Sequence, residues 1–97
     1  MSSARTVVEV SNNQAKSRYV ATFDGDPAGI AAYERSADTI VFTHTVVDED
    51  LEGHGVGSAL IRHALDDARL QGLRVVPKCE FVGAFIEEHT EYNDLVG

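Results

Sequence analysis

Apolar and polar positions alternate through the first half of the chain, which predicts β-strands. Residues 6–10 are rich in β-branched side chains and precede a Ser-Asn-Asn-Gln turn, and residues 18–23 place every second side chain on one face. The sequence Asp-Gly-Asp-Pro at 24–27 predicts a hairpin turn before a third strand at 28–35. A fourth strand is expected at 39–47. These segments predict four antiparallel strands in series.

The expected fourth strand is largely apolar on both faces, which is typical of a strand inside a sheet. Strict alternation predicts two faces, with Ile40, Phe42, His44 and Val46 on one and Val41, Thr43, Thr45 and Val47 on the other. An acidic loop follows at 48–52.

The second half changes to a helical period. Residues 57–71 predict a helix that Gly72 ends as a C-cap, and a short strand at 73–76 stops at Pro77. The apolar stripe of this helix consists of Leu60, Ile61, Ala64, Leu65 and Ala68. A strand reached through a helix should lie parallel to the strand before it. With a second helix at 80–89, the order β-β-β-β-α-β-α predicts one α/β (α+β) domain over residues 1–97, with a mixed, mostly antiparallel five-stranded sheet.

Composition narrows the classes of function. The formal charge of −8 argues against a nucleic-acid partner, and no apolar run is long enough to span a bilayer. A single cysteine, Cys79, excludes an internal disulfide framework and a CxxC metal site, which fits a reducing compartment. We therefore expect a cytoplasmic protein with no nucleic-acid or membrane partner. The oligomeric state stays open, with a monomer as the expectation.

Glycines alternate at positions 53, 55 and 57, where the first helix is expected to begin. Glycine weakens a helix, so this spacing suggests that a ligand approaches the backbone closely. The phosphate-loop motif requires a lysine that is absent here. The dinucleotide motif requires G-x-G-x-x-G directly after a strand, whereas these glycines have the spacing G-x-G-x-G and follow an acidic loop. Coenzyme A is a third ligand that carries a diphosphate.

The segment EGHGVG at 52–57 resembles the Arg/Gln-x-x-Gly-x-Gly/Ala loop of the GCN5-related N-acetyltransferases. The segments VVPKCEFV at 75–82 and HTEY at 89–92 resemble the Val-x-Pro-x-Cys-x-Phe-Val and His-Pro-Glu-Tyr segments of the short single-domain branch. The resemblance covers residues 6–96. Three features depart from the family: Glu52 replaces Arg or Gln, Thr90 replaces proline, and only a turn separates the first two strands.

The resemblance implies acetyl-CoA as the acyl donor and an amine of an unknown peptide or small molecule as the acceptor. Unpaired N–H groups at a helix start can hold a diphosphate. The residues expected to bind the donor are Val46 and Val47, which pair with the pantetheine arm, and Gly53, His54, Gly55, Val56, Gly57 and Ser58, which hold the diphosphate. No metal site is expected.

Cys79 and His44 are the candidates for chemistry. Cys79 is expected where a helix begins, a position that favours the thiolate, although a buried and inert thiol is the alternative. His44 is a candidate base or a partner of Cys79, with a packed structural histidine as the alternative. We expect acyl transfer to an amine or through the cysteine. The alternative function is a module that binds coenzyme A or a protein partner without catalysis.

Overall fold

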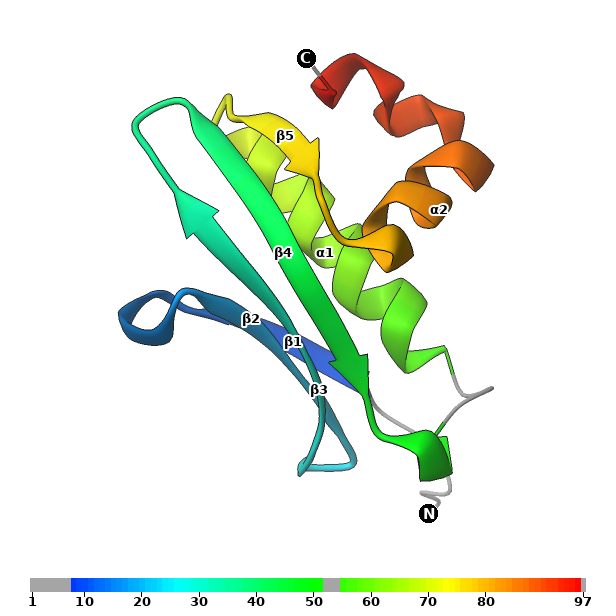
Figure 1. The fold of residues 1–97 in the computed structure, drawn as a ribbon. Coiled ribbons are helices and arrows are strands. Elements are labelled where there is room, and N and C mark those ends of the chain that lie inside the picture. The colour runs from blue at the N-terminus through cyan, green and yellow to red at the C-terminus, as the bar shows by residue number, and fades with distance from the viewer. Residues whose placement is uncertain (1–7, 52–54, 97) are drawn as a thin grey trace.

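The strands lie in the sheet in the same order as in the sequence (Figure 1). The computed structural model describes residues 8–51 and 55–96. Its strands are β1 (Val8–Asn13), β2 (Arg18–Phe23), β3 (Asp26–Arg35), β4 (Thr39–Val47) and β5 (Arg74–Pro77). The first four pair as antiparallel neighbours, and β5 pairs with β4 in parallel. The predicted fold class, a mixed and mostly antiparallel five-stranded sheet, is therefore confirmed.

Two α-helices pack together against one face of the sheet. They are α1 (Val56–Leu70), which crosses from β4 to β5, and α2 (Glu80–Glu88). The guanidinium of Arg62 on α1 lies 5.5 Å from the ring centre of Phe85 on α2, which joins the two helices. The opposite face of the sheet, turned toward the viewer in Figure 1, carries no helix formed by the described residues.

The core lies between the sheet and the helices. Every residue of the predicted stripe on α1 is buried, which confirms the helical period inferred for this segment. Tyr19 of β2 is 1 % exposed, and its hydroxyl donates a hydrogen bond of 2.6 Å to Asp67 of α1. Burial, and then this hydrogen bond, raise the pKa of the Tyr19 phenol. The bond satisfies the one polar atom of a large core side chain.

The first strand is longer than its sequence pattern suggests. A turn was expected at 11–14, but β1 continues to Asn13, and a 3₁₀ turn η1 (Gln14–Lys16) follows it. The hydroxyl of Tyr33 donates a hydrogen bond of 2.7 Å to Asn12 Oδ1, and Asn13 accepts one from the Lys16 N–H. The bond from Tyr33 and the pairing with β2 keep Asn12 in the strand, while Asn13 caps the 3₁₀ turn that follows. Residues 6 and 7 lie outside the described residues.

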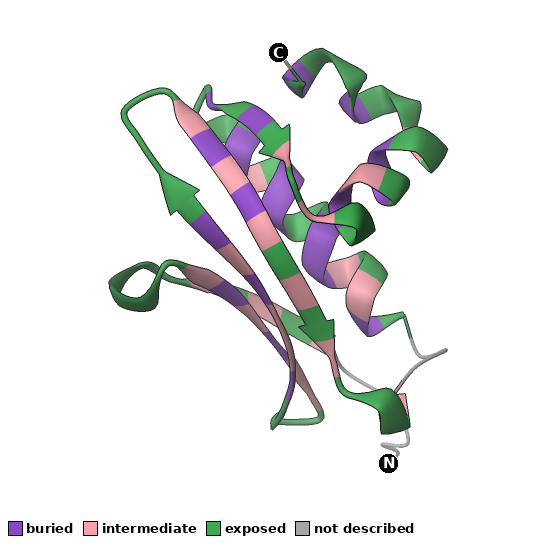
Figure 2. Cartoon of the chain, in the orientation of Figure 1, coloured by how far each residue is buried: buried purple, intermediate pink, exposed green. Residues whose placement is uncertain are grey.

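The expected alternation along β4 is wrong beyond Phe42. Ala32 of β3 pairs with His44 and the next residue, Tyr33, pairs with Phe42, so Thr43 is an extra residue in β4. Such a β-bulge shifts the alternation by one position. Ile40 and Phe42 are buried on the helix face, and beyond the bulge this face receives Thr45 and Val47 instead of His44 and Val46. Figure 2 shows the buried residues in the first half of β4.

The helix α1 ends close to Gly72, the residue that was predicted to end it. Gly72 has a positive φ of 71° and lies one residue beyond the C-cap Gln71. The N–H of Gly72 donates to the carbonyl of Arg69 at 3.1 Å, and that of Leu73 donates to Ala68 at 2.9 Å. This Schellman pattern satisfies the last carbonyls of the helix.

The C-terminal segment forms a 3₁₀ helix, η3 (Thr90–Leu95), that the sequence pattern did not predict. Arg69 of α1 donates two hydrogen bonds to Asp94, at 2.7 and 3.0 Å. Tyr92 is 3 % exposed, and its hydroxyl donates a bond of 2.7 Å to Asp66. These contacts fasten η3 to α1. A short 3₁₀ turn, η2 (Glu49–Leu51), follows β4. Within the described residues, no helix is sufficiently long and apolar to traverse a bilayer.

Two glycine substitutions should change stability in opposite directions. Gly72→Ala should lower the free energy of unfolding by about 1–2 kcal/mol, because an alanine resists the left-handed conformation. Gly83→Ala should raise it by about 0.5–1 kcal/mol, because Gly83 lies inside α2 and a Cβ there meets no described atom within 4 Å. Urea unfolding of both variants beside the parent chain measures these changes. A gain in Gly72→Ala would contradict the capping role.

Candidate functional site

β4 and β5 separate after a short paired stretch and leave a gap. β5 pairs with residues 39–42 of β4 and ends at Pro77, which has no N–H for a further ladder bond. The N–H of Cys79 then donates to the carbonyl of Phe42 at 3.0 Å, and the chain turns into α2. In Figure 1, β5 accompanies the first half of β4. The second half of β4 therefore has one edge turned toward α2 rather than toward a strand.

The β3–β4 ladder decides which backbone groups face this gap. The Asp48 N–H donates to the Ala28 carbonyl at 2.8 Å, and hydrogen-bonded pairs alternate along an antiparallel ladder. Val46, two residues earlier, therefore directs its backbone groups toward β3, whereas Thr45 and Val47 direct theirs toward the gap. Val46 and Val47 were both expected to pair with the pantetheine arm. Of these two residues, Val47 is the one whose backbone groups face the gap.

Cys79 lies at the head of the gap, as the N-cap residue of α2. Its Sγ is 3.4 Å from Thr45 Oγ1 and is also contacted by the backbone N–H groups of Val82, Phe81 and Thr45. Burial raises the pKa of the Cys79 thiol, but the hydrogen bonds from Thr45, Val82 and Phe81 outweigh burial and hold the pKa below its ordinary value. The thiol is partly buried, and its surroundings favour the thiolate.

His44 does not lie beside Cys79. Its side chain is exposed, and Nδ1 lies 3.4 Å from the hydroxyl of the adjacent Thr43. Neighbouring residues of a strand point to opposite faces, so His44 faces the side opposite Thr45 and Cys79. The β-bulge therefore places the two candidates for chemistry on different faces of the sheet.

The start of α1 provides backbone donors without a side-chain cap. Gly55 is the N-cap residue, with φ of 80°, and no described side chain makes a capping hydrogen bond to this helix. The Ala59 N–H is the first to be bonded within the helix, to the Gly55 carbonyl at 3.0 Å. The N–H groups of Val56, Gly57 and Ser58 thus stand at the positive end of the helix. Gly53 and His54, also expected here, lie outside the described residues.

The glycines at 55 and 57 are required for different reasons. Gly55 adopts a left-handed conformation, and a Cβ there would meet no described atom within 4 Å. A Cβ on Gly57 would come within 2.5 Å of the Phe81 ring. Gly57 is therefore explained by the packing of Phe81 against the first turn of α1, while no described atom occupies the space at Gly55.

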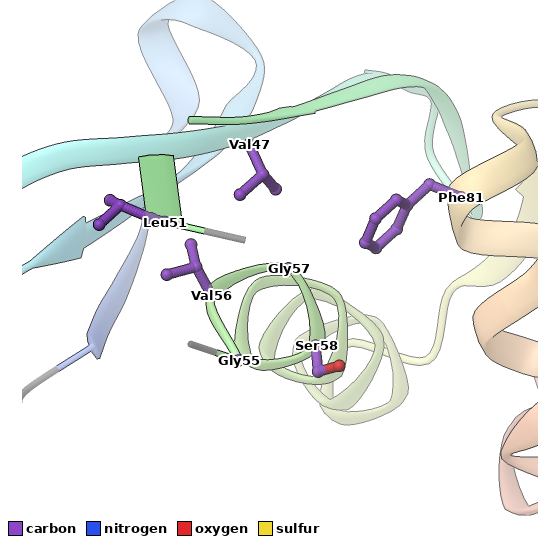
Figure 3. Close-up of a pocket in the computed structure, with 7 residues that line it drawn as sticks. All are labelled: Val47, Leu51, Gly55, Val56, Gly57, Ser58 and Phe81. Atoms are coloured by element: carbon purple, nitrogen blue, oxygen red, sulfur yellow. The ribbon is translucent and has the colours of Figure 1, made fainter. Parts of the chain in front are cut away.

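A cavity of about 330 Å³ opens at this place (Figure 3). Its lining comes from β4, α1, α2 and the segment between β4 and α1: Val47, Leu51, Gly55, Val56, Gly57, Ser58 and Phe81. Val47 and Phe81 point toward each other over the first turn of α1. The described lining carries no charged side chain and combines apolar walls with uncapped N–H groups. These properties fit a diphosphate joined to an uncharged arm.

The remaining polar and aromatic side chains of α1, α2 and η3 differ in their surroundings. Tyr92 is held by Asp66, and burial followed by this hydrogen bond raises its pKa. His63 is exposed, and Asp67 accepts the bond from Tyr19 described above. Phe85 belongs to the core, whereas Phe81 lines the cavity.

Thr45 and Leu51 are site residues that the sequence analysis missed. Leu51 was counted only as part of an acidic loop. Thr45 contacts Cys79 because the bulge turns its side chain to the helix face. Strict alternation had predicted that Thr45 lies on the face opposite Ile40 and Phe42.

Comparisons with known proteins agree with this geometry. The family model of the GCN5-related N-acetyl-transferases matches residues 18–95. No curated protein sequence matches the chain. A GCN5-like protein from Staphylococcus aureus, solved by NMR, superposes with a TM-score of 0.69 at 24 % identity over 92 % of this chain and 87 % of its own.

Two longer proteins share the fold. The ribosomal-protein-S18-alanine N-acetyltransferase of Escherichia coli gives a TM-score of 0.57 at 21 % identity, over 76 % of this chain and 42 % of its own. Ard1 of Thermoplasma volcanium gives 0.56 at 30 % identity, over 63 % of this chain and 43 % of its own. The chain thus spans less than half the length of either protein. Its family match covers most of the chain, and it belongs to the GCN5-related N-acetyltransferase family.

Proposed function

We propose that this protein binds acetyl-CoA and transfers the acyl group to an amine, directly or through Cys79. The observation that carries the proposal is the position of the start of α1, which no described side chain caps and which opens on the same cavity as the edge of β4 that no described strand pairs with. One site thereby combines N–H donors for a diphosphate with a strand edge for an arm that carries amide groups. Family membership supports this class of reaction.

The start of α1 holds the diphosphate in this proposal. The N–H groups of Val56, Gly57 and Ser58 donate, and Gly53 and His54 remain expected contributors. The lining formed by the described residues carries no charged side chain, so these residues add no repulsion of their own to the negative charge of the protein. When bound, the thioester supplies an activated acyl group.

The reacting end lies beside Cys79 and Thr45. The arm extends along the β4 edge, where the backbone groups of Val47 face the gap. At Cys79 the Thr45 hydroxyl and three N–H groups surround Sγ, and together they stabilise negative charge at that atom. This arrangement suits a Cys79 thiolate that accepts the acyl group while the C–S bond of the donor breaks and coenzyme A leaves as a thiolate.

His44 serves the acceptor in this proposal. It is exposed on the sheet face that no described helix covers, so an amine arriving from that face meets its imidazole. A ring nitrogen of His44 takes the proton that the amine loses on acylation. The separation of His44 from Cys79 also favours the alternative, in which the module binds coenzyme A without catalysis.

Mass measurement after incubation with acetyl-CoA separates these functions. We expect a single acetyl adduct that is lost in Cys79→Ala, and acetylation of a panel of peptide and small amines that is strongly reduced in His44→Gln. His63→Gln is a matched control, because His63 is exposed on α1 and away from the gap. Coenzyme A binding by calorimetry with neither adduct nor acetylated amine would favour the module.

Ser58→Asp should separate binding from stability. A carboxylate in the first turn of α1 should raise the free energy of unfolding by about 0.3–1 kcal/mol through the helix dipole. The same charge should weaken coenzyme A binding by about 10- to 100-fold, since like charges several ångströms apart repel at an effective dielectric near 20. Calorimetry and urea unfolding measure the two effects, with Ser58→Asn as the neutral control. Unchanged affinity in Ser58→Asp would remove the start of α1 from the site.

The pH profile of Cys79 alkylation tests its surroundings. The alkylation rate should reach its half-maximum at a lower pH than that of a cysteine in a short peptide, because the folded pKa is depressed. Thr45→Val should move this midpoint upward by removing the hydroxyl donor. Thr43→Val is the control, since the Thr43 hydroxyl donates to the Ala32 carbonyl at 3.3 Å instead. Equal midpoints in the parent and Thr45→Val would contradict this account.

A further inference from the structure

The sheet face that no described helix covers carries a hollow of about 230 Å³ over β2, β3 and β4. Its lining includes Val20, Pro27, Ile30, Val46 and Asp48. Val20 pairs with Ile30, and Ile30 pairs with Val46, so these three side chains form one aliphatic row on this face. Val46 is 56 % exposed, and the row is therefore open to solvent.

The next row of side chains on this face places a cation opposite His44. Arg18 pairs with Ala32, which in turn pairs with His44. Because adjacent strands are about 4.8 Å apart, the backbones of Arg18 and His44 are about 10 Å apart. The small side chain of Ala32 lies between them and leaves room for a ligand above the sheet.

Arg18 has a donor without an acceptor. Its Nε is buried, and no described atom accepts its hydrogen. Neither of the ion pairs between described residues involves Arg18, so no carboxylate compensates its charge. A buried charged donor without a partner is costly. The side chain as a whole is only partly buried, and it is flexible enough to turn Nε and one Nη toward a carboxylate, which matches two parallel donors.

The far end of the hollow has the opposite charge. Asp48 belongs to the lining, and its Oδ1 accepts a hydrogen bond of 3.0 Å from the Asp50 N–H. Its carboxylate repels an anion at that end. A ligand that carries a carboxylate and an aliphatic group therefore places the carboxylate at Arg18 and the aliphatic group on the aliphatic row.

We propose that this face binds an aliphatic α-amino acid as the acyl acceptor. The carboxylate pairs with Arg18, the amine lies at His44, and the aliphatic side chain rests on the aliphatic row. On transfer, the neutral amine forms a bond to the acyl carbon, the C–S bond of the thioester breaks, and His44 takes the proton that the amine loses. The product is an N-acyl amino acid. This inference rests on the proposed function, because it names the class of the acceptor.

Binding of leucine and leucinamide, followed by NMR titration without an acyl donor, tests the contact with Arg18. The two compounds share the amine and the side chain, but leucinamide has no carboxylate. Leucine should bind about 10- to 100-fold more tightly, as expected for hydrogen bonds between charged groups. Arg18→Gln should remove this preference. Arg35→Gln is the matched control, because Arg35 is exposed on β3 and pairs with Ile40 on the helix face.

Val46→Thr tests the aliphatic row. The parent chain should bind leucine about tenfold more tightly than glycine, because the leucine side chain covers apolar surface. Val46→Thr should reduce this ratio by about threefold, since a hydroxyl replaces one methyl group of the row. Val41→Thr is the control, because Val41 lies on the same face but does not line the hollow. An unchanged ratio in Val46→Thr would contradict the placement of the side chain.

Equal binding of leucine and leucinamide to the parent chain overturns the inference, and so does a full preference in Arg18→Gln. Mass measurement with acetyl-CoA distinguishes its failure from that of the proposed function. N-acetyl-leucine that forms with the parent chain and is lost with Arg18→Gln supports both. Leucine binding that depends on Arg18, without acetylation of any amine, supports the binding site and overturns transfer. Acetylation of other amines without leucine binding overturns the amino-acid site alone.

Discussion

One extra residue in β4 determines which side chains can meet at the site. Thr43 has no counterpart on β3, so every later side chain of β4 is turned to the face opposite that expected from strict alternation. Thr45 and Val47 consequently reach the helix side, where they contact Cys79 and line the cavity. His44 and Val46 are exposed on the other side. In the proposed function, the donor and the acceptor therefore approach from opposite faces of one strand.

The separation of β4 and β5 supplies the space for this arrangement. Pro77 cannot continue the ladder, and the Cys79 N–H forms a last bond to Phe42 before α2 begins. The chain then places three N–H groups and a threonine hydroxyl around the Cys79 sulfur. The end of the β4–β5 ladder at Pro77 therefore creates the gap, and the turn into α2 that follows it fixes the electrostatic surroundings of the thiol.

Local dipoles and net charge act in opposite directions on an anionic ligand. The protein carries a formal charge of −8, which disfavours anions at long range. Salt screens this effect beyond about 8 Å at physiological ionic strength, whereas N–H groups in direct contact with a ligand are screened little. Since the described cavity lining is uncharged, the contact interactions at α1 can dominate. Phe81 forms one wall of this cavity, and its ring packs on Gly57.

The sequence by itself determined the order of elements, the parallel β5, the buried stripe of α1 and the glycine after its end. These features depend on local periodicity and on backbone preferences, which are written in neighbouring residues. It also identified the start of α1 and the position of Cys79 at the start of α2. Only the tertiary structure decided the bulge at Thr43, the contact of Thr45 with Cys79, the packing of Phe81 on Gly57 and the fastening of η3 by Arg69. Each of these depends on pairing register or on side chains far apart in the chain, and no local pattern specifies either.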